Sequence, residues 1–409
     1  MNRSFFKPYD FRWDVLDIII GGKSSIDSQH GLQIHTLDEA ERFLMSYGLD
    51  LTNPIESAET LGHFHEALNF IRRYFLFPEN QDGLKIEIPR KILELTNVRE
   101  LFLMASLSFP SQSNDSSGVF LGNWACALLK VMHTIAHVDQ DLRSVYFVDI
   151  QKQILDRFYR EIHRDETGRL YLGENDDPTR VELHSFETKP KKSRDSTLLK
   201  LLHKSENVAE DIFDRVGIRF VTLTPLGALR VIKYLKDHMI VMPPNIKPSR
   251  SRNTLIDLEA FRMKLGQLTL RLERNELTDQ QYHDEVKLAA TSLHHDHANP
   301  HSSEFYRSIQ FTARQLIKLR NPLFDDMKEL KGIFKAQGLP EAAAKVIERV
   351  DMKYLQKEIR FFYPYEVQVV DVASHEENEK GRSAHSEYKK AQLHTAMKRV
   401  MGPLADASR

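Results

Sequence analysis

One short stretch of the chain, EVQVVDVASHEENEKGRSAHSEYK at residues 366–389, combines residue types at a spacing that could carry out chemistry. It opens with an alternation that puts Glu366 and Gln368 on one face of a predicted strand and valines on the other. A carboxylate and an amide on such a face can bind a cation, accept a proton or orient a hydroxyl group. His375 and Glu379 follow on a predicted helix next to that face.

A second carboxylate, Asp214, stands just before the predicted strand VGIRFVTLT. Taken alone, Asp214 and Glu366 are each more typical of solvated or ion-paired strand ends. If their two strands are neighbours, however, both carboxylates point into one oxygen-rich site. Mg²⁺ prefers one or two carboxylates together with water and phosphate oxygens. The pair therefore predicts a Mg²⁺ site, on condition that the two strands are neighbours.

The stretch KPKKSRDSTLLKLLHK, at 189–204, puts several cations at the start of a predicted helix. Backbone N–H groups, the helix dipole and lysines all favour a phosphate group there. Ser196 and Lys200 are four residues apart and share one helix face. In SSEFYRSIQFT, at 302–312, Tyr306 could stack on a base beside Gln310. The alternatives are a solvated basic loop for the first stretch and an ordinary amphipathic strand for the second.

Two groups of histidines have a spacing that could ligate a metal ion, but other interpretations are favoured. The stretch LHHDHANPHSS has an irregular spacing and no cysteine, which is typical of a polar loop. The stretch MHTIAHVDQD lacks the neighbouring acidic ligands of a metal hydrolase and indicates a cluster on a helix surface. The residues concerned are His294, His295, His297 and His301 in the first stretch and His133, His137 and Asp139 in the second.

The elements that would position these residues belong to two regions. Apolar residues three and four apart predict a mainly helical domain over 1–150. Two-residue alternation then appears in RLYLGE, TRVELHSFETKP, VGIRFVTLT and IRFFYPYEVQVVDV, with helical patterns between them. We therefore predict an α+β domain over 151–400, a mixed sheet flanked by helices, with helical insertions near 254–293 and 322–358. Thr278 and Gln281 form a predicted capping box in the first insertion.

The composition is that of a globular protein: of the 409 residues, 41% are apolar and 28% are charged, and the net charge is −1. This balance gives no global basic field for nonspecific binding of nucleic acid. A single cysteine, Cys126, excludes an intramolecular disulfide and suits a buried thiol in a reducing compartment. No continuous apolar run spans a bilayer and no secretory signal opens the chain, so we expect a cytoplasmic protein without a membrane partner. An oligomer is compatible with the sequence.

Taken in order, these segments resemble the synthetase domain of the RelA/SpoT family, the alarmone synthetases. That family has the pattern E-x-Q-I-R-T, followed at fixed offsets by H, E, G, A-A-H and Y-K. The resemblance covers roughly residues 180–392 and is interrupted by the two insertions. The residues that fall in register are Glu366, Gln368, His375, Glu379, Gly381, Ala384, His385, Tyr388 and Lys389.

The resemblance implies a nucleotidyltransferase-like synthetase fold and a function in the stringent response. The implied enzyme is a pyrophosphokinase that uses Mg²⁺ and moves pyrophosphate from ATP to the 3′-hydroxyl of GDP or GTP. The implied roles are catalysis by Glu366, Asp214 and Arg219, metal binding by Asp214 and Glu366, ATP binding by Lys192, Ser196 and Lys200, and acceptor binding by Tyr306, Gln310 and Gln368. The helical domain lacks the family's His-Asp hydrolase signature, so we predict synthesis without hydrolysis.

Three departures from the family pattern leave alternatives open. Pro190, Gln310 and Val370 stand where the family has arginine, histidine and arginine. The same chemistry could therefore act on another acceptor, an adenine nucleotide or the 3′ end of tRNA, with KPSRSR at 247–252 as a candidate basic surface. A non-catalytic nucleotide-binding regulator is the third hypothesis, although a pure binding module needs no pair of metal carboxylates.

Overall fold

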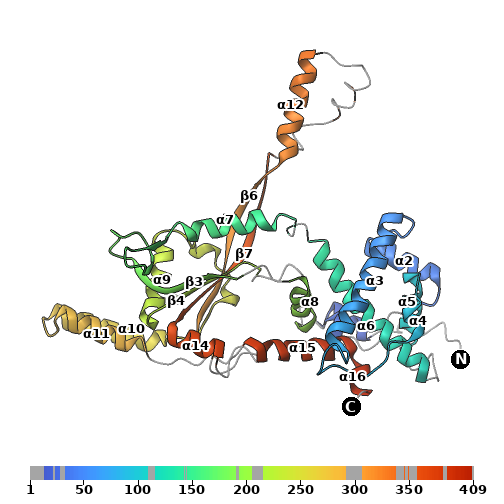
Figure 1. Ribbon diagram of the computed structural model, residues 1–409, viewed down its shortest axis with the longest axis horizontal. Coiled ribbons are helices and arrows are strands. Elements are labelled where there is room, and N and C mark those ends of the chain that lie inside the picture. The colour runs from blue at the N-terminus through green and yellow to red at the C-terminus, as the bar shows by residue number, and fades with distance from the viewer. Residues whose placement is uncertain are drawn as a thin grey trace. The chain divides into compact units, whose positions relative to one another are not determined.

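The computed structural model describes most of the chain (Figure 1). The described residues are 13–21, 24–27, 33–108, 116–141, 143, 145–189, 193–204, 215–291, 306–337, 345, 349, 357–380 and 385–407. They form two compact units. The first contains Met1–Ser144, Lys192–Ile212 and His385–Arg409, and the second contains Val145–Lys191 and Phe213–Ala384.

The first unit is helical. Its α-helices are α1 (Trp13–Ile19), α2 (Leu37–Tyr47), α3 (Pro54–Phe75), α4 (Arg90–Leu93), α5 (Val98–Ser106), α6 (Ser116–Asp139), α8 (Arg194–His203), α15 (His385–Met401) and α16 (Pro403–Ala407), with a 3₁₀ turn η2 (Ser25–Asp27). Helix α6 supplies much of the core, where Trp124 and Leu128 are fully buried. In the described part of the chain only α6 is long and apolar enough to cross a membrane, with a mean hydropathy of 1.4, and 67% of that stretch is buried inside the structure.

Two segments of this unit differ from the predicted division at residue 150. Helix α8 and helix α15 were assigned to the α+β region, but both belong to the helical unit. Leu198 and Leu202 of α8 and Val400 of α15 enter the same core as α6. An Arg399 guanidinium nitrogen donates to the carbonyl of Leu202 at 2.9 Å, which ties α15 to α8. These segments are apolar on one face, and the pattern alone does not say which core that face joins.

The second unit is built on one seven-stranded mixed sheet with the strand order β1-β2-β3-β4-β7-β6-β5. The strands are β1 (Ile162–Arg164), β2 (Leu170–Leu172), β3 (Val181–Thr188), β4 (Gly217–Thr222), β5 (Arg252–Asn253), β6 (Ile309–Arg320) and β7 (Glu358–Asp371). Strands β4 and β7 pair in parallel, and every other pair is antiparallel. The condition set for the strands VGIRFVTLT and YEVQVV is met, because they are neighbours in the sheet. The predicted α+β class with a mixed sheet flanked by helices is confirmed.

The helices of the second unit are α7 (Phe147–Tyr159), α9 (Pro225–Asp237), α10 (Leu258–Glu273), α11 (Asp279–Ala289), α12 (Pro322–Gln337) and α14 (Val372–Lys380), with 3₁₀ turns η5 (Pro243–Asn245) and η6 (Pro248–Arg250). Helices α7 and α9 bury their apolar sides in one core with the sheet, where the ring of Phe158 contacts those of Phe220 and Tyr365. Helix α14 follows directly on β7.

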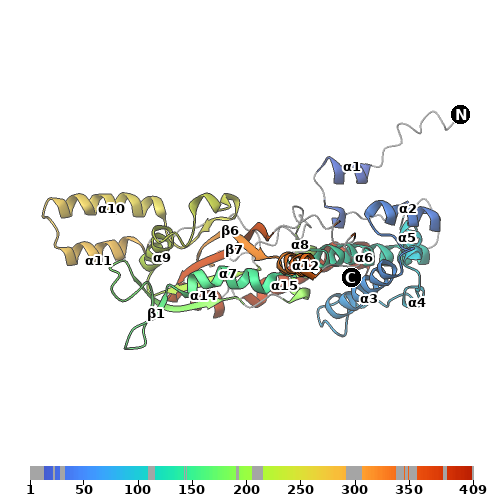
Figure 2. The ribbon, with the colours of Figure 1, turned by 90° about the horizontal axis from the view of Figure 1, so that it is seen from above.

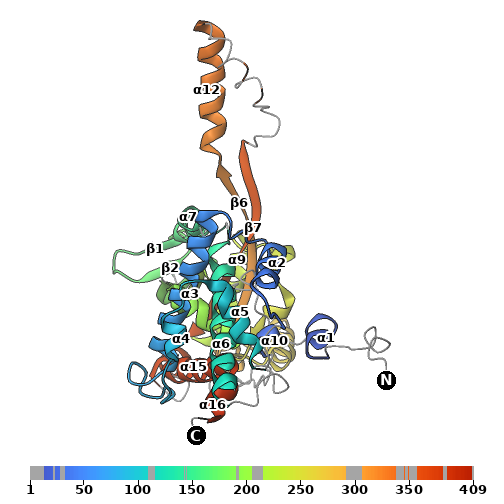
Figure 3. The same ribbon diagram turned by 90° about the vertical axis from the view of Figure 1, so that its right-hand side faces the viewer.

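The two predicted insertions differ in how far the structure describes them. The first is a helical hairpin, and Figure 2 shows α10 and α11 side by side. Its capping box is confirmed, because Thr278 accepts from the backbone of Gln281 and the Gln281 side chain accepts from the backbone of Thr278. The second insertion contains α12 at the end of the ribbon formed by β6 and β7 (Figure 3). Most of 338–356 lies outside the described residues.

Candidate functional site on the polar face of the sheet

One row of polar residues crosses five neighbouring strands of the second unit. Strand register sets Glu187 of β3 beside Arg219 of β4, Arg219 beside Gln368 of β7, Gln368 beside Gln310 of β6, and Gln310 beside Arg252 of β5. Side chains at paired positions point to the same face of a sheet. The alternation in the sequence therefore builds a continuous polar row from strands that are far apart along the chain.

The opposite face explains why this row keeps its register. Val367 and Val369 alternate with the polar residues of β7 and are fully buried in the core of the second unit. Ile218 and Phe220 alternate in the same way in β4. A slip of one residue would move these apolar side chains out of the core, so burial on one face fixes the polar side chains on the other.

Glu366 lies in the next row and has both carboxylate oxygens occupied by protein groups. Lys189 Nζ lies 2.6 Å from Glu366 Oε1, and Gln310 Nε2 donates to Glu366 Oε2 at 2.6 Å. Glu366 is 8% exposed, so an ionised carboxylate here requires such partners. Its neighbour on β4 is Gly217, and a Cβ at that position would lie 2.5 Å from Lys189 Cδ. The missing side chain leaves room for the stem of Lys189.

Arg219 is the centre of a second set of contacts. Its Nε donates to Gln368 Oε1 at 2.9 Å, and its Nη1 lies 3.3 Å from Glu187 Oε2 and 3.0 Å from Glu379 Oε1. His375 of α14 lies 3.6 Å from the other oxygen of Glu187. In this structure the guanidinium is therefore already paired with two carboxylates.

Tyr306 joins this network through its hydroxyl. Gln368 Nε2 donates to the Tyr306 hydroxyl, while Gln368 Oε1 accepts from Arg219. Gln368 is 2% exposed, and both ends of its amide are satisfied. The structure thus brings five of the predicted residues together on one unit: Arg219, Tyr306, Gln310, Glu366 and Gln368.

The described charged side chains of the polar row and of its contacts balance. Lys189, Arg219 and Arg252 are the cations, and Glu187, Glu366 and Glu379 are the carboxylates. A polyphosphate bound here would require further cations. Carboxylate oxygens are the ligand type that Mg²⁺ prefers, and in this structure both oxygens of Glu366 are bonded to protein groups.

The four remaining predicted residues are not among the described residues of this sheet. Asp214 and Lys192 are outside the described residues. Ser196 and Lys200 are on α8 of the first unit, where the Ser193 hydroxyl caps the helix by accepting from the backbone of Ser196 at 3.2 Å. Among the residues that the structure describes, no three His, Cys, Asp or Glu side chains form a group that could hold a metal ion.

Sequence reasoning missed the importance of Lys189 and Glu187, which the basic loop and the end of β3 contribute. Lys189 is predicted only as one of the cations that open the stretch at 189–204, not as the partner of Glu366. The signal for both was the strand pattern of TRVELHSFETKP, but the pairing partner of that strand decides where its end lies. Of the departures, Val370 is 1% exposed and brings no charge. The buried Asp371 beside it has one oxygen, Oδ1, that finds no hydrogen-bond partner among the residues that the structure describes.

The histidines near the end of α6 contact other groups of the first unit. His133 Nδ1 lies 2.7 Å from the Tyr47 hydroxyl and its ring packs against that of His137. Burial, and secondarily the charge of His137, lowers the pKa of His133 to about 4. Asp139 pairs with His63 and Arg194. The other histidine stretch, at 294–301, lies outside the described residues.

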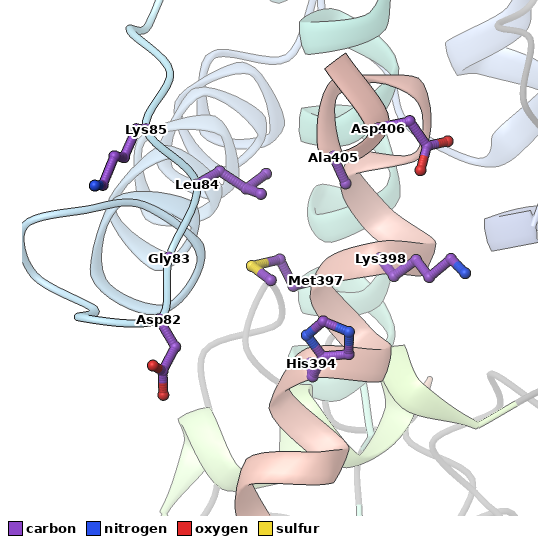
Figure 4. A pocket seen from close by; sticks show the side chains of 9 residues that line it. All are labelled: Asp82, Gly83, Leu84, Lys85, His394, Met397, Lys398, Ala405 and Asp406. Carbon is purple, nitrogen blue, oxygen red and sulfur yellow. The ribbon is translucent and has the colours of Figure 1, made fainter. Parts of the chain in front are cut away.

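A cavity of about 320 Å³ lies in the first unit and contains none of the predicted site residues (Figure 4). Leu84 and Met397 point into it, whereas the charged ends of Lys85 and Lys398 point away. Its walls come from the loop after α3 and from α15 and α16. The residues that line it are Asp82, Gly83, Leu84, Lys85, His394, Met397, Lys398, Ala405 and Asp406.

Comparison of the chain with models of known protein families gives no match, and neither does comparison with curated proteins. The chemical interpretation of this site therefore depends on the residues themselves. Any function has to explain three features. They are the polar row, Glu366 with a protein partner at each carboxylate oxygen, and Tyr306 with its hydrogen bond from Gln368.

Proposed function

We propose that this chain is a nucleotide pyrophosphokinase of the alarmone-synthetase type, built on the family's nucleotidyltransferase-like fold. In the reaction, the 3′-hydroxyl oxygen of GDP or GTP forms a bond to the β-phosphorus of ATP. The bond between that phosphorus and the oxygen bridging to the α-phosphate breaks, and AMP leaves. The hydroxyl proton passes to a base. The products are AMP and a nucleotide that carries a 3′-pyrophosphate.

The observation that carries the proposal is the row Glu187–Arg219–Gln368–Gln310, with Glu366 beside it. The segments that resemble the synthetases and lie on this sheet are separated by up to about 150 residues in the sequence. Four of their residues meet on adjacent strands: Arg219, Gln310, Glu366 and Gln368. A chance match in sequence has no reason to converge on one face of one sheet. Convergence of independent local signals supports a common site.

Glu366 is the group we assign as the base. It is buried and held by two donors, which fixes its orientation for a substrate hydroxyl. For proton transfer one of its oxygens has to exchange a protein donor for that hydroxyl. Gln310 is neutral and can rotate away without leaving a charge unpaired, so we assign the exchange to its side.

Mg²⁺ is implied because the described charges of the cluster balance and leave no net positive charge to offset a polyphosphate. When bound, the ion supplies charge neutralisation at the phosphate oxygens. Glu366 and Asp214 would hold it, since Asp214 comes three residues before Gly217, the neighbour of Glu366 on β4. Lys189 and Arg219 add the protein's own cations.

Tyr306 and Gln368 are the residues we assign to the acceptor. The hydrogen bond from Gln368 fixes the hydroxyl end of Tyr306, and the ring is the group we propose to stack on a base. Stacking of a base on an aromatic side chain contributes about 1–3 kcal/mol. Arg252, beside Gln310 on the edge strand, is a specific reason to keep a tRNA end as a second acceptor, because phosphate contacts dominate its affinity.

A non-catalytic nucleotide-binding regulator is the other candidate, and one observation favours it. Both oxygens of Glu366 are engaged by the protein, so the carboxylate already has the partners that a structural role demands. In that case the polar row would hold a nucleotide without activating its hydroxyl.

The test is transfer of label from γ-³²P-ATP, in the presence of Mg²⁺, to GDP, GTP, ADP or bulk tRNA in separate reactions. Transfer with equal release of AMP, lost in Glu366→Gln, is the expected result. Glu358→Gln is the matched control, because Glu358 lies on the same strand and pairs with exposed Arg360. A Glu366→Gln variant that transfers label as fast as the unaltered chain would overturn the assignment. No transfer to any acceptor, with nucleotide binding retained, would identify the regulator instead.

A further inference from the structure

Asn378 of α14 holds the backbone of the residue that follows Tyr306. Its Oδ1 accepts from the Arg307 N–H at 3.2 Å, and its Nδ2 donates to the Arg307 carbonyl at 2.9 Å. The amide thus imitates a strand partner and satisfies both backbone groups of one residue. Asn378 is 6% exposed, so water does not compete freely for these bonds.

Thr254 holds the same segment at its other backbone groups. The Thr254 hydroxyl donates to the Tyr306 carbonyl at 2.9 Å and accepts from the Ser308 N–H at 3.0 Å. The backbone N–H of Thr254 donates to the Ser308 carbonyl at 2.9 Å. From the carbonyl of Tyr306 to that of Ser308, every backbone donor and acceptor therefore has a partner in Asn378 or Thr254.

Helix α14 also reaches the side chain of Tyr306. Glu379, next to Asn378, pairs with Arg219, which donates to Gln368, which in turn donates to the Tyr306 hydroxyl. Two neighbouring residues of one helix thus act on the tyrosine by separate routes. Asn378 fixes the backbone after Tyr306, and Glu379 acts through Arg219 and Gln368 on the hydroxyl of the ring.

We propose that Asn378 is a positioning residue that holds the Tyr306–Ser308 segment in the conformation that binds the acceptor nucleotide. The proposal rests on the proposed function for the identity of the ligand. A loop that is ordered before binding loses less conformational entropy when the ligand arrives. Asn378 touches neither substrate in this account, so its removal should weaken acceptor binding and leave ATP binding unchanged.

The first experiment measures order without any ligand. Hydrogen exchange of the peptide that contains Arg307 is compared in the unaltered chain, Asn378→Ala and Asn378→Asp, with Glu377→Ala on the exposed side of α14 as control. Aspartate keeps the acceptor for the Arg307 N–H and loses the donor to its carbonyl. We expect about a tenfold or greater rise in exchange rate for alanine, a smaller rise for aspartate and none for the control. Unchanged exchange in Asn378→Ala overturns the proposal.

The second experiment separates this proposal from the proposed function. In Asn378→Ala we expect the acceptor KM to rise about tenfold, with the KM for ATP and kcat changed less than twofold, and Asn378→Asp to be intermediate. An equal rise in both KM values would show general damage to the fold and overturn a positioning role. If the unaltered chain transfers nothing, the Kd for GDP replaces the acceptor KM. Absence of both transfer and GDP binding would overturn the proposed function and the acceptor role together, while the exchange result would still decide whether Asn378 orders the segment.

Discussion

The Lys189 ammonium nitrogen lies 2.6 Å from a carboxylate oxygen of Glu366, although 177 residues separate the two along the chain. Lys189 follows β3, Glu366 is in β7, and β4 runs between these strands. The stem of Lys189 crosses β4 at Gly217, whose backbone carbonyl accepts from the Lys189 N–H at 2.8 Å. The charge balance at the centre of the site therefore depends on a glycine that carries no functional group.

We expect the Lys189–Glu366 pair to be strongly coupled. The side chain of Glu366 is 11% exposed and that of Lys189 is 32% exposed, so removal of the lysine leaves a largely buried carboxylate short of a cation. A double-mutant cycle with Lys189→Met and Glu366→Gln, measured by denaturant unfolding, should give a coupling energy of about 1–3 kcal/mol.

The matched control is the Arg90–Glu94 pair of the first unit, whose side chains are 88% and 60% exposed. Exposed pairs four residues apart on a helix couple by about 0.3–0.5 kcal/mol. Equal coupling in the two pairs would mean that burial adds nothing at Glu366, which is contrary to our account.

Gly217→Ala should break the same contact without removing a charged group. The added Cβ would meet the stem of Lys189 at 2.5 Å, so the stem has to move away from Glu366. Overpacking of this kind costs about 1–3 kcal/mol of unfolding free energy. Unfolding by urea measures the loss, and the coupling between Lys189 and Glu366 should fall in this background.

A control for the glycine itself is Gly266→Ala in α10, where an added Cβ has no heavy atom within 4 Å. Alanine favours a helix over glycine by up to about 1 kcal/mol, so this variant should be more stable. If Gly217→Ala raised the unfolding free energy as Gly266→Ala does, the close approach of Lys189 to Gly217 would not affect stability.

The sheet that carries the site could be predicted in good part from the sequence. Alternation of apolar and polar residues in β4 and in the second half of β7 predicts these strands, although the structure buries nearly every residue of both segments. The C-terminal part of β6 was not, because ARQLIKLR at 313–320 has long polar side chains and no clear period of two. That part is a strand because it pairs with β7 over its whole length.

Only part of the candidate site could be predicted from the same sequence patterns. Glu366, Gln368 and Arg219 lie on strongly patterned strands, and their meeting requires only that β4 and β7 be neighbours. Lys189 and Asn378 could not be assigned, because their roles depend on tertiary contacts with a strand and a loop that are distant in sequence. Local pattern encodes which face a residue occupies, whereas the partner across that face is set by packing.

Tyr306→Phe separates the two parts of the proposed role of the tyrosine. Phenylalanine keeps the ring for stacking and loses the bond from Gln368 that orients it. We expect acceptor affinity to fall about three- to tenfold, which corresponds to one hydrogen bond of about 1 kcal/mol. Tyr306→Leu should lose more, because it also removes the stacking surface.

The acceptor Kd, measured by isothermal titration calorimetry in the presence of Mg²⁺, distinguishes the two variants. Phenylalanine and leucine variants with equal losses would argue that the hydroxyl, and not the ring, is what the acceptor requires. An unchanged Kd in both would remove Tyr306 from the acceptor site.

His133 should make the first unit sensitive to acid. Burial lowers the pKa of His133 in the folded chain to about 4, below its ordinary value of 6.5. Between these two pH values the unfolded chain therefore binds a proton that the folded chain does not, and unfolding free energy falls as pH falls through this window. The full change for His133 is about 3 kcal/mol, and it is complete below pH 4.

Unfolding of the first unit can be followed by Trp124, which is fully buried on the same helix, in a Trp13→Phe background. Because carboxylates also titrate in this range, the quantity to compare is the difference between the unaltered chain and His133→Gln. We expect this difference in unfolding free energy to shift by about 2–3 kcal/mol between pH 7 and pH 4, in favour of the glutamine variant as pH falls. His65→Gln, on the exposed side of α3, is the control substitution. A pH-independent difference for His133→Gln would mean that this histidine titrates alike in the folded and unfolded chain.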